Sequence, residues 1–504
     1  MIQRLLLFSI FLMSLGSAPA QIITESQAGS EFAHYASQDL QKVLGGFSDE
    51  YDGHVSKGGR DLFLVDRASG DTDIWSGPGV EQFIPVKNAD GKSPLLLVRY
   101  FGNLENRKGQ QVETNVSNAY IIADILNELP FLFHLELSSG QVQCAEQAGD
   151  SLWVLVKSEG SILINDSLFR DSPAEELVLL LIEKNGAIST EPIFNSSGEY
   201  QIADMHRTKD GLFMVGSFLG PVQIGPETIA PPTSYFDGLF LHWNQGRQEI
   251  EHLEIASGVF DVRLTHLALQ ENDTLLLGEY FGNVMLGGEL LEDVRLNNSL
   301  FLFSYRKKEL VNIGGEREEQ AINMHPESDG SIIITGNHLG RFEYDELMAD
   351  CPGDACGFFL QLDESFKARN FHNFYSSERT DIFNSYLFQQ GLFCGSYRGN
   401  YRETNPISIG EDWFCERIAL STSVVESEKE KQLLLYPNPT AKEAIHMDAP
   451  WPGSHFQLFD VGGRLLRKGT WSGQLSVVGL SRGIHFLRIY DENASKMFTF
   501  NKVN

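Results

Sequence analysis

Short runs of alternating apolar and polar residues, separated by turns, make up most of this chain, and that alternation is typical of β-strands. The clearest stretch lies around residues 200–255, where Lys209-Asp210-Gly211 and Asn244-Gln245-Gly246 give turns and Pro226–Ser234 gives a Pro-rich excursion. The predicted strands there are Tyr200–Thr208, Leu212–Ile224, Phe236–Trp243 and Arg247–Ile255. Patterns with the helical period are nearly absent, so we predict an all-β fold.

One short pattern recurs along the chain: a few apolar residues, usually a glycine, then an aromatic residue and often a second glycine. Its seven copies are anchored at residues 45, 98, 156, 216, 278, 336 and 395, at spacings of 53–62 residues. Repeats that hold four antiparallel strands each are the signature of β-propeller blades. We therefore predict a seven-bladed β-propeller over Gln21–Ser421, with a pair of β-sandwich domains as the rival architecture.

The repeated motif, Gly-x-[Phe/Tyr]-x-Gly followed by a strand such as Asp412–Cys415, resembles the SBBP-type β-propeller repeat. Two copies depart from it, because Lys157-Ser158 replaces the glycine and the aromatic residue in one copy and Val98 replaces the first glycine in another. A glycine inside a strand usually marks a bulge or a close backbone approach. We interpret the glycines as packing positions, and the aromatic residues as core between blades in preference to a carbohydrate platform.

The C-terminal segment Leu433–Asn504 has a strand pattern of its own. Pro437 and Pro439 favour an extended entry segment, Phe456–Phe459 and His485–Ile489 alternate as half-buried strands do, and Gly462-Gly463 reads as a hairpin turn. In this order the motifs closely resemble the C-terminal type A sorting domain of the type IX secretion system of Bacteroidota. The sorting-motif residues are Tyr436, Pro437, Asn438, Pro439, Gly463 and Gly483.

This resemblance covers about a seventh of the chain and implies a sorting signal for export. It implies a small β-sandwich (Ig-like) domain over residues 433–504, a polar linker over 422–432 near which the domain is removed on export, and the type IX secretion machinery as a partner. The alternative is an ordinary β-sandwich that was appended for stability.

The N-terminus has the features of a secretory signal peptide. Arg4 precedes the apolar run Leu5–Leu15, and Ala18-Pro19-Ala20 forms a cleavage site of the A-x-A type. The run is too short to span a membrane, and no later segment approaches 18 consecutive apolar residues. We therefore predict a signal peptide over residues 1–20, no transmembrane segment, and a secreted or outer cell-surface protein exported through the Sec and type IX routes.

The charge of the chain is concentrated in its body. The whole chain has a formal net charge of −29, and Gln21–Gln432 carries 30 Lys+Arg against 63 Asp+Glu, a net charge of −33. Such a surface repels phosphate backbones and anionic lipid, so no nucleic-acid partner is expected. It suits Ca²⁺ or cationic partners, or it simply keeps an extracellular protein soluble.

Five cysteines are too few for a disulfide scaffold in a chain of 504 residues. Cys351 and Cys356 flank a short loop, and Cys394 and Cys415 fall on strands that are expected to be neighbours, so either pair can form a disulfide in an oxidising compartment. Cys144 remains and is expected to be a buried small apolar residue.

A column of histidines is the main candidate for a ligand site. His34, His206, His266 and His325 each lie about 11 residues before a repeat anchor, where other copies have Lys87 and Asn384. First strands of propeller blades line the central channel, so these side chains converge on a metal or an anionic ligand, or they are inherited hydrogen-bonding residues.

Two acidic segments are candidates for Ca²⁺ through oxygen ligands, although solvated turns are the simpler explanation for both. They contain Asp49, Glu50 and Asp52 in the first and Asp71 and Asp73 in the second. The sequence contains no GxSxG, HExxH, P-loop or EF-hand motif, and no catalytic residue or required cofactor is assigned.

We interpret the chain as a secreted or cell-surface β-propeller that binds an extracellular glycan or protein. Two alternatives stay open: a propeller-type extracellular glycan lyase or hydrolase, and a structural or adhesive surface protein.

Overall fold

The computed structural model divides the chain into two compact units, one of which is Gln21–Leu420, while the other includes Ser421–Asn504. It describes residues 22–502 except 26–30, 37–41, 49, 52–53, 57–60, 67–68, 70, 77–81, 85, 89–95, 107–110, 115, 117, 125–128, 150, 184, 226, 231–233, 271–272, 293–296, 328, 388–391, 400–407, 418–434, 437–443, 448–454, 461–463, 472–473 and 491–494. The predicted signal peptide lies outside the described residues. The described part contains strands and no helix, which confirms the all-β prediction, and so it has no helix long and apolar enough to cross a membrane.

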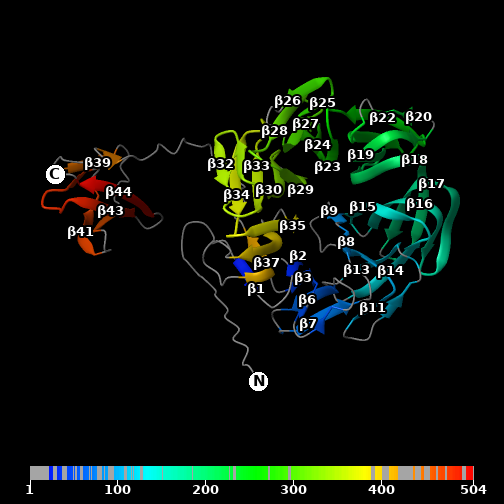
Figure 1. Ribbon diagram of the computed structural model, residues 1–504, viewed down its shortest axis with the longest axis horizontal. Helices are drawn as coiled ribbons and strands as arrows, with labels where there is room; N and C mark the ends of the chain where they lie inside the picture. Colours follow the sequence, from blue (N-terminus) through cyan, green and yellow to red (C-terminus); the bar gives the residue numbers. More distant parts are fainter. Residues whose placement is uncertain are drawn as a thin grey trace. The chain divides into compact units, whose positions relative to one another are not determined.

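Three separate four-stranded antiparallel sheets show the basic plan of the larger unit (Figure 1). The first contains β23 (Val262–Gln270), β24 (Asp273–Phe281), β27 (Asn298–Ser304) and β28 (Glu309–Ile313). The second contains β29 (Glu319–Pro326), β30 (Ile332–His338), β33 (Cys356–Leu362) and β34 (Ala368–Phe374). The third contains β35 (Arg379–Leu387), β36 (Leu392–Gly399), β37 (Ser408–Arg417) and β1 (Ile22–Glu25).

Hairpins extend two of these sheets between their second and third strands. They are β25 (Asn283–Leu286) with β26 (Glu289–Glu292), and β31 (Arg341–Tyr344) with β32 (Leu347–Asp350). Because each hairpin leaves from the end of the second strand, it enlarges one end of its sheet.

The preceding residues form one sheet of 13 strands and one of six. The larger contains β8 (Gln82–Ile84), β9 (Val86–Asn88), β10 (Leu96–Tyr100), β13 (Asn118–Asp124), β14 (Leu129–Leu137), β15 (Gly140–Ala148), β16 (Ser151–Ile164), β17 (Ser167–Glu183), β18 (Ile188–Arg207), β19 (Gly211–Ile224), β20 (Glu227–Ile229), β21 (Asp237–Asn244) and β22 (Glu249–Ala256). The smaller contains β2 (Glu31–Ala36), β3 (Lys42–Phe47), β6 (Asp61–Asp66), β7 (Asp71–Ser76), β11 (Asn103–Asn106) and β12 (Gln111–Glu113). The short pair β4 (Glu50–Tyr51) and β5 (His54–Val55) lies outside both.

The strand plan expected around residues 200–255 is present, with one correction. The first strand does not begin at Tyr200, because β18 runs without a break from Ile188 to Arg207. Its first part, up to Asn195, pairs with β17 and its second part, from Ser196, pairs with β19. This long strand joins two successive groups of strands, and the pairing of β14 with β16 joins a third, which explains why the sheet has 13 members.

Successive sheets are packed face to face, and alternate residues of one strand serve two different cores. Leu275 and Leu277 of β24 share a core with Ile332 and Ile334 of β30 in the following sheet. Leu276, which points the other way, lies in a core with Val215 of the preceding sheet. Full burial of such a side chain stabilises by roughly 1.5–3 kcal/mol. Strands buried on both faces explain the continuous apolar runs of the sequence.

The two ends of the larger unit meet. The N-terminal strand β1 pairs antiparallel with β37, from Ile22 opposite Glu416 to Glu25 opposite Trp413. The next strand, β2, lies against β35, β36 and β37. Figure 1 shows the first strand of each sheet toward the middle of this unit and the last strands toward its outside.

The repeated aromatic position is core, as expected. In six of the seven repeats the residue two positions after the anchor is aromatic and 1 % exposed or less, whereas the remaining repeat has Ser158, which is also buried. The six aromatic residues are Phe47, Tyr100, Phe218, Tyr280, His338 and Tyr397. The repeated glycines are close-approach positions: a Cβ on Gly216 would lie 2.0 Å from the carbonyl oxygen of Gln201, and one on Gly395 would lie 2.0 Å from that of Asp381.

The C-terminal unit has two small sheets around one core. One contains β38 (Leu435–Tyr436), β39 (Ala444–Met447) and β42 (Gln474–Ser476), and the other contains β40 (His455–Asp460), β41 (Leu465–Thr470), β43 (Gly483–Tyr490) and β44 (Ser495–Lys502). Leu475 of the first sheet is buried with Leu458 and Leu487 of the second, which is sandwich packing.

The structure places only some of the sorting-motif residues. Tyr436 lies in β38, while Pro437, Asn438, Pro439 and Gly463 lie outside the described residues. Gly483 opens β43 with a φ of 122°, in the region that favours glycine. The strands on either side of Gly463, β40 and β41, pair antiparallel.

Candidate ligand-binding sites

A β-bulge interrupts the first strand of a repeat, the strand before the anchor, in six of the seven repeats. The register shifts at this point fall at Ala33/Tyr35, Val142/Cys144, Ile202/Asp204, Leu264/His266, Ala321/Asn323 and Ile382/Asn384. A bulge adds one residue to a strand and re-aims the side chains that follow it. It therefore decides which residues of these strands are equivalent.

This register separates the histidines that the sequence had placed in one column. His206 and His325 are equivalent, because each lies two residues beyond the point at which strand pairing continues after the bulge. His266 lies at that point itself. His34 is the bulged residue of β2, and its side chain lies outside the described residues. Asn384 occupies the same place as His266.

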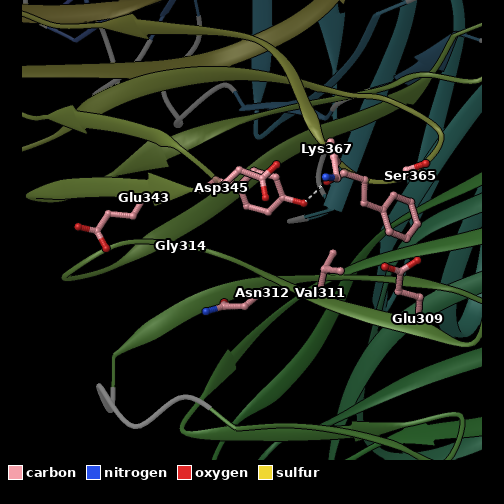
Figure 2. A pocket seen from close by; sticks show the side chains of 10 residues that line it. Glu309, Val311, Asn312, Gly314, Glu343, Asp345, Ser365 and Lys367 are labelled. Carbon is pink, nitrogen blue, oxygen red and sulfur yellow. Dashed lines mark hydrogen bonds between the residues drawn. The ribbon is translucent and has the colours of Figure 1, made fainter.

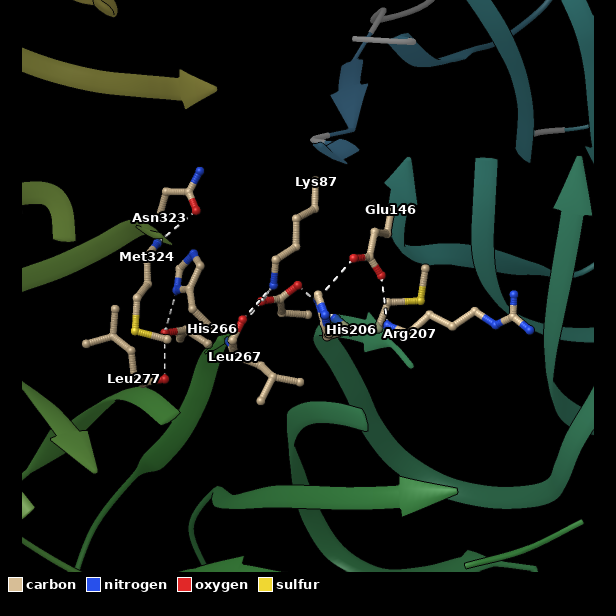
Figure 3. A network of polar contacts seen from close by, with 12 residues as sticks. Lys87, Glu146, His206, Arg207, His266, Leu267, Leu277, Asn323 and Met324 are labelled. Carbon is tan, nitrogen blue, oxygen red and sulfur yellow. Dashed lines mark hydrogen bonds and ion pairs between the residues drawn. The ribbon is translucent and has the colours of Figure 1, made fainter. Parts of the chain in front are cut away.

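A lysine from a distant part of the chain connects two of these first strands (Figure 3). The Lys87 ammonium lies 2.8 Å from the Asp204 carboxylate and donates to the Leu267 carbonyl at 2.5 Å. The same Asp204 oxygen accepts the Leu267 backbone N–H at 2.8 Å. Because β9 pairs with β15, and β18 and β23 begin the two following groups of strands, this contact connects three neighbouring groups.

His206 is held by a carboxylate of the preceding group of strands. Its Nδ1 lies 3.0 Å from Glu146 Oε1, and the other carboxylate oxygen accepts the Arg207 backbone N–H at 3.0 Å. The Arg207 guanidinium lies 3.5 Å from the centre of the Trp153 ring. Glu146 thus fixes the end of β18 from β15, as Figure 3 shows.

Protein atoms also surround the other two histidines. His266 contacts the Ile322 carbonyl through Nε2 at 2.9 Å and the Thr265 hydroxyl through Nδ1 at 3.0 Å. Burial lowers its pKa. Burial, together with the positive charge of Lys87, lowers the pKa of His325 to about 4. Both imidazoles are therefore neutral near pH 7.

The described residues contain no group of three or more His, Cys, Asp and Glu side chains arranged to hold a metal ion. Of the two acidic candidates for calcium, Asp49 and Asp52 lie outside the described residues, as does the side chain of Glu50. Asp71 and Asp73 do not form a loop as expected, because both belong to β7, which pairs with β6.

The structure joins both expected cysteine pairs. Cys351 is bonded to Cys356, and Cys394 is bonded to Cys415 directly across β36 and β37. Cys144 is a free thiol and is buried, and burial raises its pKa well above the usual value.

The larger unit also contains two hollows. The first, of about 490 Å³, is shown in Figure 2. It is lined by Glu309, Val311, Asn312, Gly314, Glu343, Tyr344, Asp345, Ser365, Phe366 and Lys367. The Tyr344 hydroxyl donates to the Phe366 carbonyl and closes one side, while carboxylates make the lining polar and acidic.

The second hollow, of about 400 Å³, is more aromatic. It is lined by Tyr235, Phe260, Asp261, Arg263, Glu279, Phe281, Asn298 and Glu318. Sequence reasoning missed it. The available signal was the second aromatic of Tyr280-Phe281-Gly282: because successive residues of a strand point to opposite faces, burial of Tyr280 turns Phe281 outward.

No family model and no curated protein matches the chain. Among solved structures, the extracellular domain of BT4673 from B. thetaiotaomicron is similar at 9% sequence identity over 94% of this chain and 86% of that chain, with a TM-score of 0.16. The extracellular domain of BT3049 from the same organism is similar at 9% identity over 94% of this chain and 85% of that one, with a TM-score of 0.14.

Proposed function

We propose that this protein is an extracellular ligand-binding β-propeller with seven blades, and that a C-terminal sorting domain of the type IX secretion system directs it to the cell surface. The observation that carries the proposal is the antiparallel pairing of β1 with β37, strands from opposite ends of the larger unit. Such a pairing is what a closed ring of blades requires, because it completes the last blade with the first strand.

The strand order supports seven blades. Seven successive four-stranded antiparallel groups can be followed along the larger unit: β2-β3-β6-β7, β8-β10-β13-β14, β15-β16-β17-β18, β18-β19-β21-β22, β23-β24-β27-β28, β29-β30-β33-β34 and β35-β36-β37-β1. Propellers arrange four to eight such groups around a channel and bind ligands on the exposed ends. Cores shared between successive sheets fit this arrangement.

The case for export rests on the two termini and on the separate core of the C-terminal unit. Leu458, Leu475 and Leu487 close that core among residues of the unit itself, so it can fold and be recognised without the propeller. The partner in export is the type IX secretion machinery, after Sec-dependent passage of the inner membrane. The ligand of the propeller is an extracellular glycan or protein.

Export is tested by removing the C-terminal segment and by transferring it to another protein. Removing Leu433–Asn504 should leave a folded body in the periplasm, measured by cell fractionation and by resistance of the body to protease. Fusing residues 422–504 to a signal-peptide-bearing periplasmic reporter should carry the reporter to the cell surface of a host with the secretion system. Surface delivery of the truncated chain, or a fusion that stays in the periplasm, would contradict the sorting assignment.

The architecture is tested separately. Electron microscopy of the purified mature protein should show a ring with seven lobes, and six or eight lobes would contradict the strand grouping. Removing Ile22–Glu25 should lower the unfolding temperature, because β37 then becomes an unpaired edge.

A further inference from the structure

The aromatic hollow at the ends of β21, β23 and β24 has the construction of a binding site. Its lining comes from segments that are far apart in sequence: Tyr235 precedes β21, Phe260 and Asp261 precede β23, Phe281 ends β24, and Glu318 precedes β29. These segments meet at one end of their sheets, and the enclosed volume is about 400 Å³. That is within the range of small-molecule sites.

Asp261 ties the aromatic segments together. Its carboxylate accepts the Phe236 backbone N–H at 3.1 Å, and its carbonyl accepts the Phe281 backbone N–H at 3.0 Å. The next residue, Val262, donates its backbone N–H to the Phe236 carbonyl at 2.8 Å. Three separate segments are therefore fixed around one residue, and the aromatic side chains they carry are held in place before any ligand arrives.

The aromatic rings form a continuous edge-to-face series. Tyr235 and Phe260 have centroids 5.4 Å apart at an interplanar angle of 67°, and Phe260 and Phe281 have centroids 5.1 Å apart at 84°. Edge-to-face packing leaves ring faces available to a third partner. Tyr235 is 43 % exposed, and the other two rings are partly exposed. The series thus forms an accessible aromatic wall.

Polar groups of both kinds complete the lining. The Arg263 guanidinium lies 4.4 Å from the centre of the Phe236 ring and 3.6 Å from the Asp261 carboxylate, and it offers N–H donors from a half-exposed position. Glu279 supplies a carboxylate that is fixed by the Ala321 backbone N–H at 3.3 Å. Asn298 and Glu318 line the same space. Donors and acceptors therefore stand beside the aromatic wall.

We propose that this hollow binds an uncharged saccharide. A sugar ring offers a face of C–H groups that packs on aromatic rings and a rim of hydroxyls that both donate and accept hydrogen bonds, and this lining matches both. The three carboxylates of Asp261, Glu279 and Glu318 outnumber the single guanidinium of Arg263, and the body carries a net charge of −33, so anionic glycans are repelled. This assignment specifies the class of ligand for the proposed extracellular binding protein, and it depends on that proposed function.

The test begins with the mature protein on an array that holds neutral, uronate-bearing and sulfated glycans together with lysine-rich and arginine-rich peptides. We expect neutral glycans to bind. The best of them is then titrated by calorimetry into the parent and into Tyr235→Ala, Phe260→Ala and Tyr235→Phe variants. Loss of one stacking ring should weaken binding about tenfold, since such contacts contribute on the order of 1 kcal/mol or more. Tyr235→Phe keeps the ring and should retain most of the affinity.

Phe101→Ala is the matched control. Phe101 is 49 % exposed and occupies, in Tyr100-Phe101-Gly102, the place that Phe281 has in its own repeat, but it does not line the hollow. Its replacement should change affinity less than about twofold. If Phe260→Ala does not fold, Tyr235→Ala still decides the matter, because its side chain is largely at the surface.

The outcomes separate this site from the broader function. Neutral glycans that bind both alanine variants as tightly as the parent would overturn the hollow as the site and leave the binding function standing. Binding only to cationic peptides would overturn the saccharide and keep a binding protein. An array on which the folded protein binds nothing would overturn both.

Discussion

Replacing one repeated glycine tests whether the close backbone approach beside the bulge is a structural requirement. Gly216 pairs with Ile202, the last residue before the bulge of β18. A Cβ there would lie 2.0 Å from the Gln201 carbonyl oxygen and 2.9 Å from the Ile202 Cα, and both are backbone atoms. Since no side chain can rotate away, Gly216→Ala must push β18 and β19 apart.

The size of the effect follows from how far that shift can go. Val156 occupies the equivalent place in β16, opposite Val142, so a bulge can be built around a side chain when the strands are set for it. The strands can therefore adapt in part, and we expect a cost in the usual range for overpacking, about 1–3 kcal/mol. The control is Gly246→Ala in a turn of the same sheet, where the nearest atom is the Asn244 side-chain oxygen at 3.4 Å, and it should cost less than about 0.5 kcal/mol.

The measurement is urea unfolding of the mature protein with both variants and the parent, followed by tryptophan fluorescence. The transition of the larger unit should shift for Gly216→Ala and stay in place for Gly246→Ala. Equal unfolding midpoints for the two variants would refute this prediction, because it attributes the loss of stability in Gly216→Ala to the backbone contact alone.

Three further predictions follow from other contacts. Because burial lowers the pKa of His325 to about 4, while an unfolded histidine titrates near 6.5, the unfolded chain takes up this proton first as the pH falls. Stability should therefore drop between about pH 6.5 and pH 4, by up to about 1.4 kcal/mol per pH unit from this group, and His325→Asn should flatten that drop in urea titrations. The Cys394→Ala, Cys415→Ala variant should have a free energy of unfolding lower by about 3 kcal/mol, because that disulfide closes a loop with a sequence separation of 21. Removing the other disulfide should lower the free energy of unfolding by less. Asn337→Ala should cost about 1–3 kcal/mol, because it strips the Ile382 backbone N–H of its acceptor at 2.7 Å, whereas Asn337→Asp keeps that acceptor and should cost less.

The parts of the fold that the sequence predicted are the local ones. Turns such as Lys209-Asp210-Gly211 and the alternation along β19 and β21 depend on neighbouring residues, and they placed the strands within a few positions. The beginning of β18 was placed wrongly, at Tyr200 instead of Ile188. In the structure β18 pairs first with β17 and then with β19, which is a property of the whole sheet.

The histidine column shows where the prediction of a site from the sequence fails. Counting back from the repeat glycine gives 10 residues to His206, 11 to His325 and 12 to His266. Turn length accounts only for the difference of one residue between His206 and His325, which occupy the same strand position. His266 differs because it lies two residues earlier in its strand, at the residue where pairing resumes. The partners of these side chains, Glu146 for His206 and the Ile322 carbonyl for His266, lie in neighbouring groups of strands. No local pattern could have predicted them.

The bulge also accounts for the polar residue beside two of the repeated glycines, Gly278 and Gly336. The residue just before the bulge directs its backbone N–H toward the preceding sheet, where a side chain must accept it. Glu279, the neighbour of Gly278, accepts from Ala321 at 3.3 Å, and Asn337, the neighbour of Gly336, accepts from Ile382 at 2.7 Å. The glycine lets the strands close over the bulge, and its polar neighbour holds the next sheet. Glu279 therefore has two roles, because the carboxylate that fixes the following sheet also lines the aromatic hollow, so that the position of the site is set by the same contacts that join the sheets.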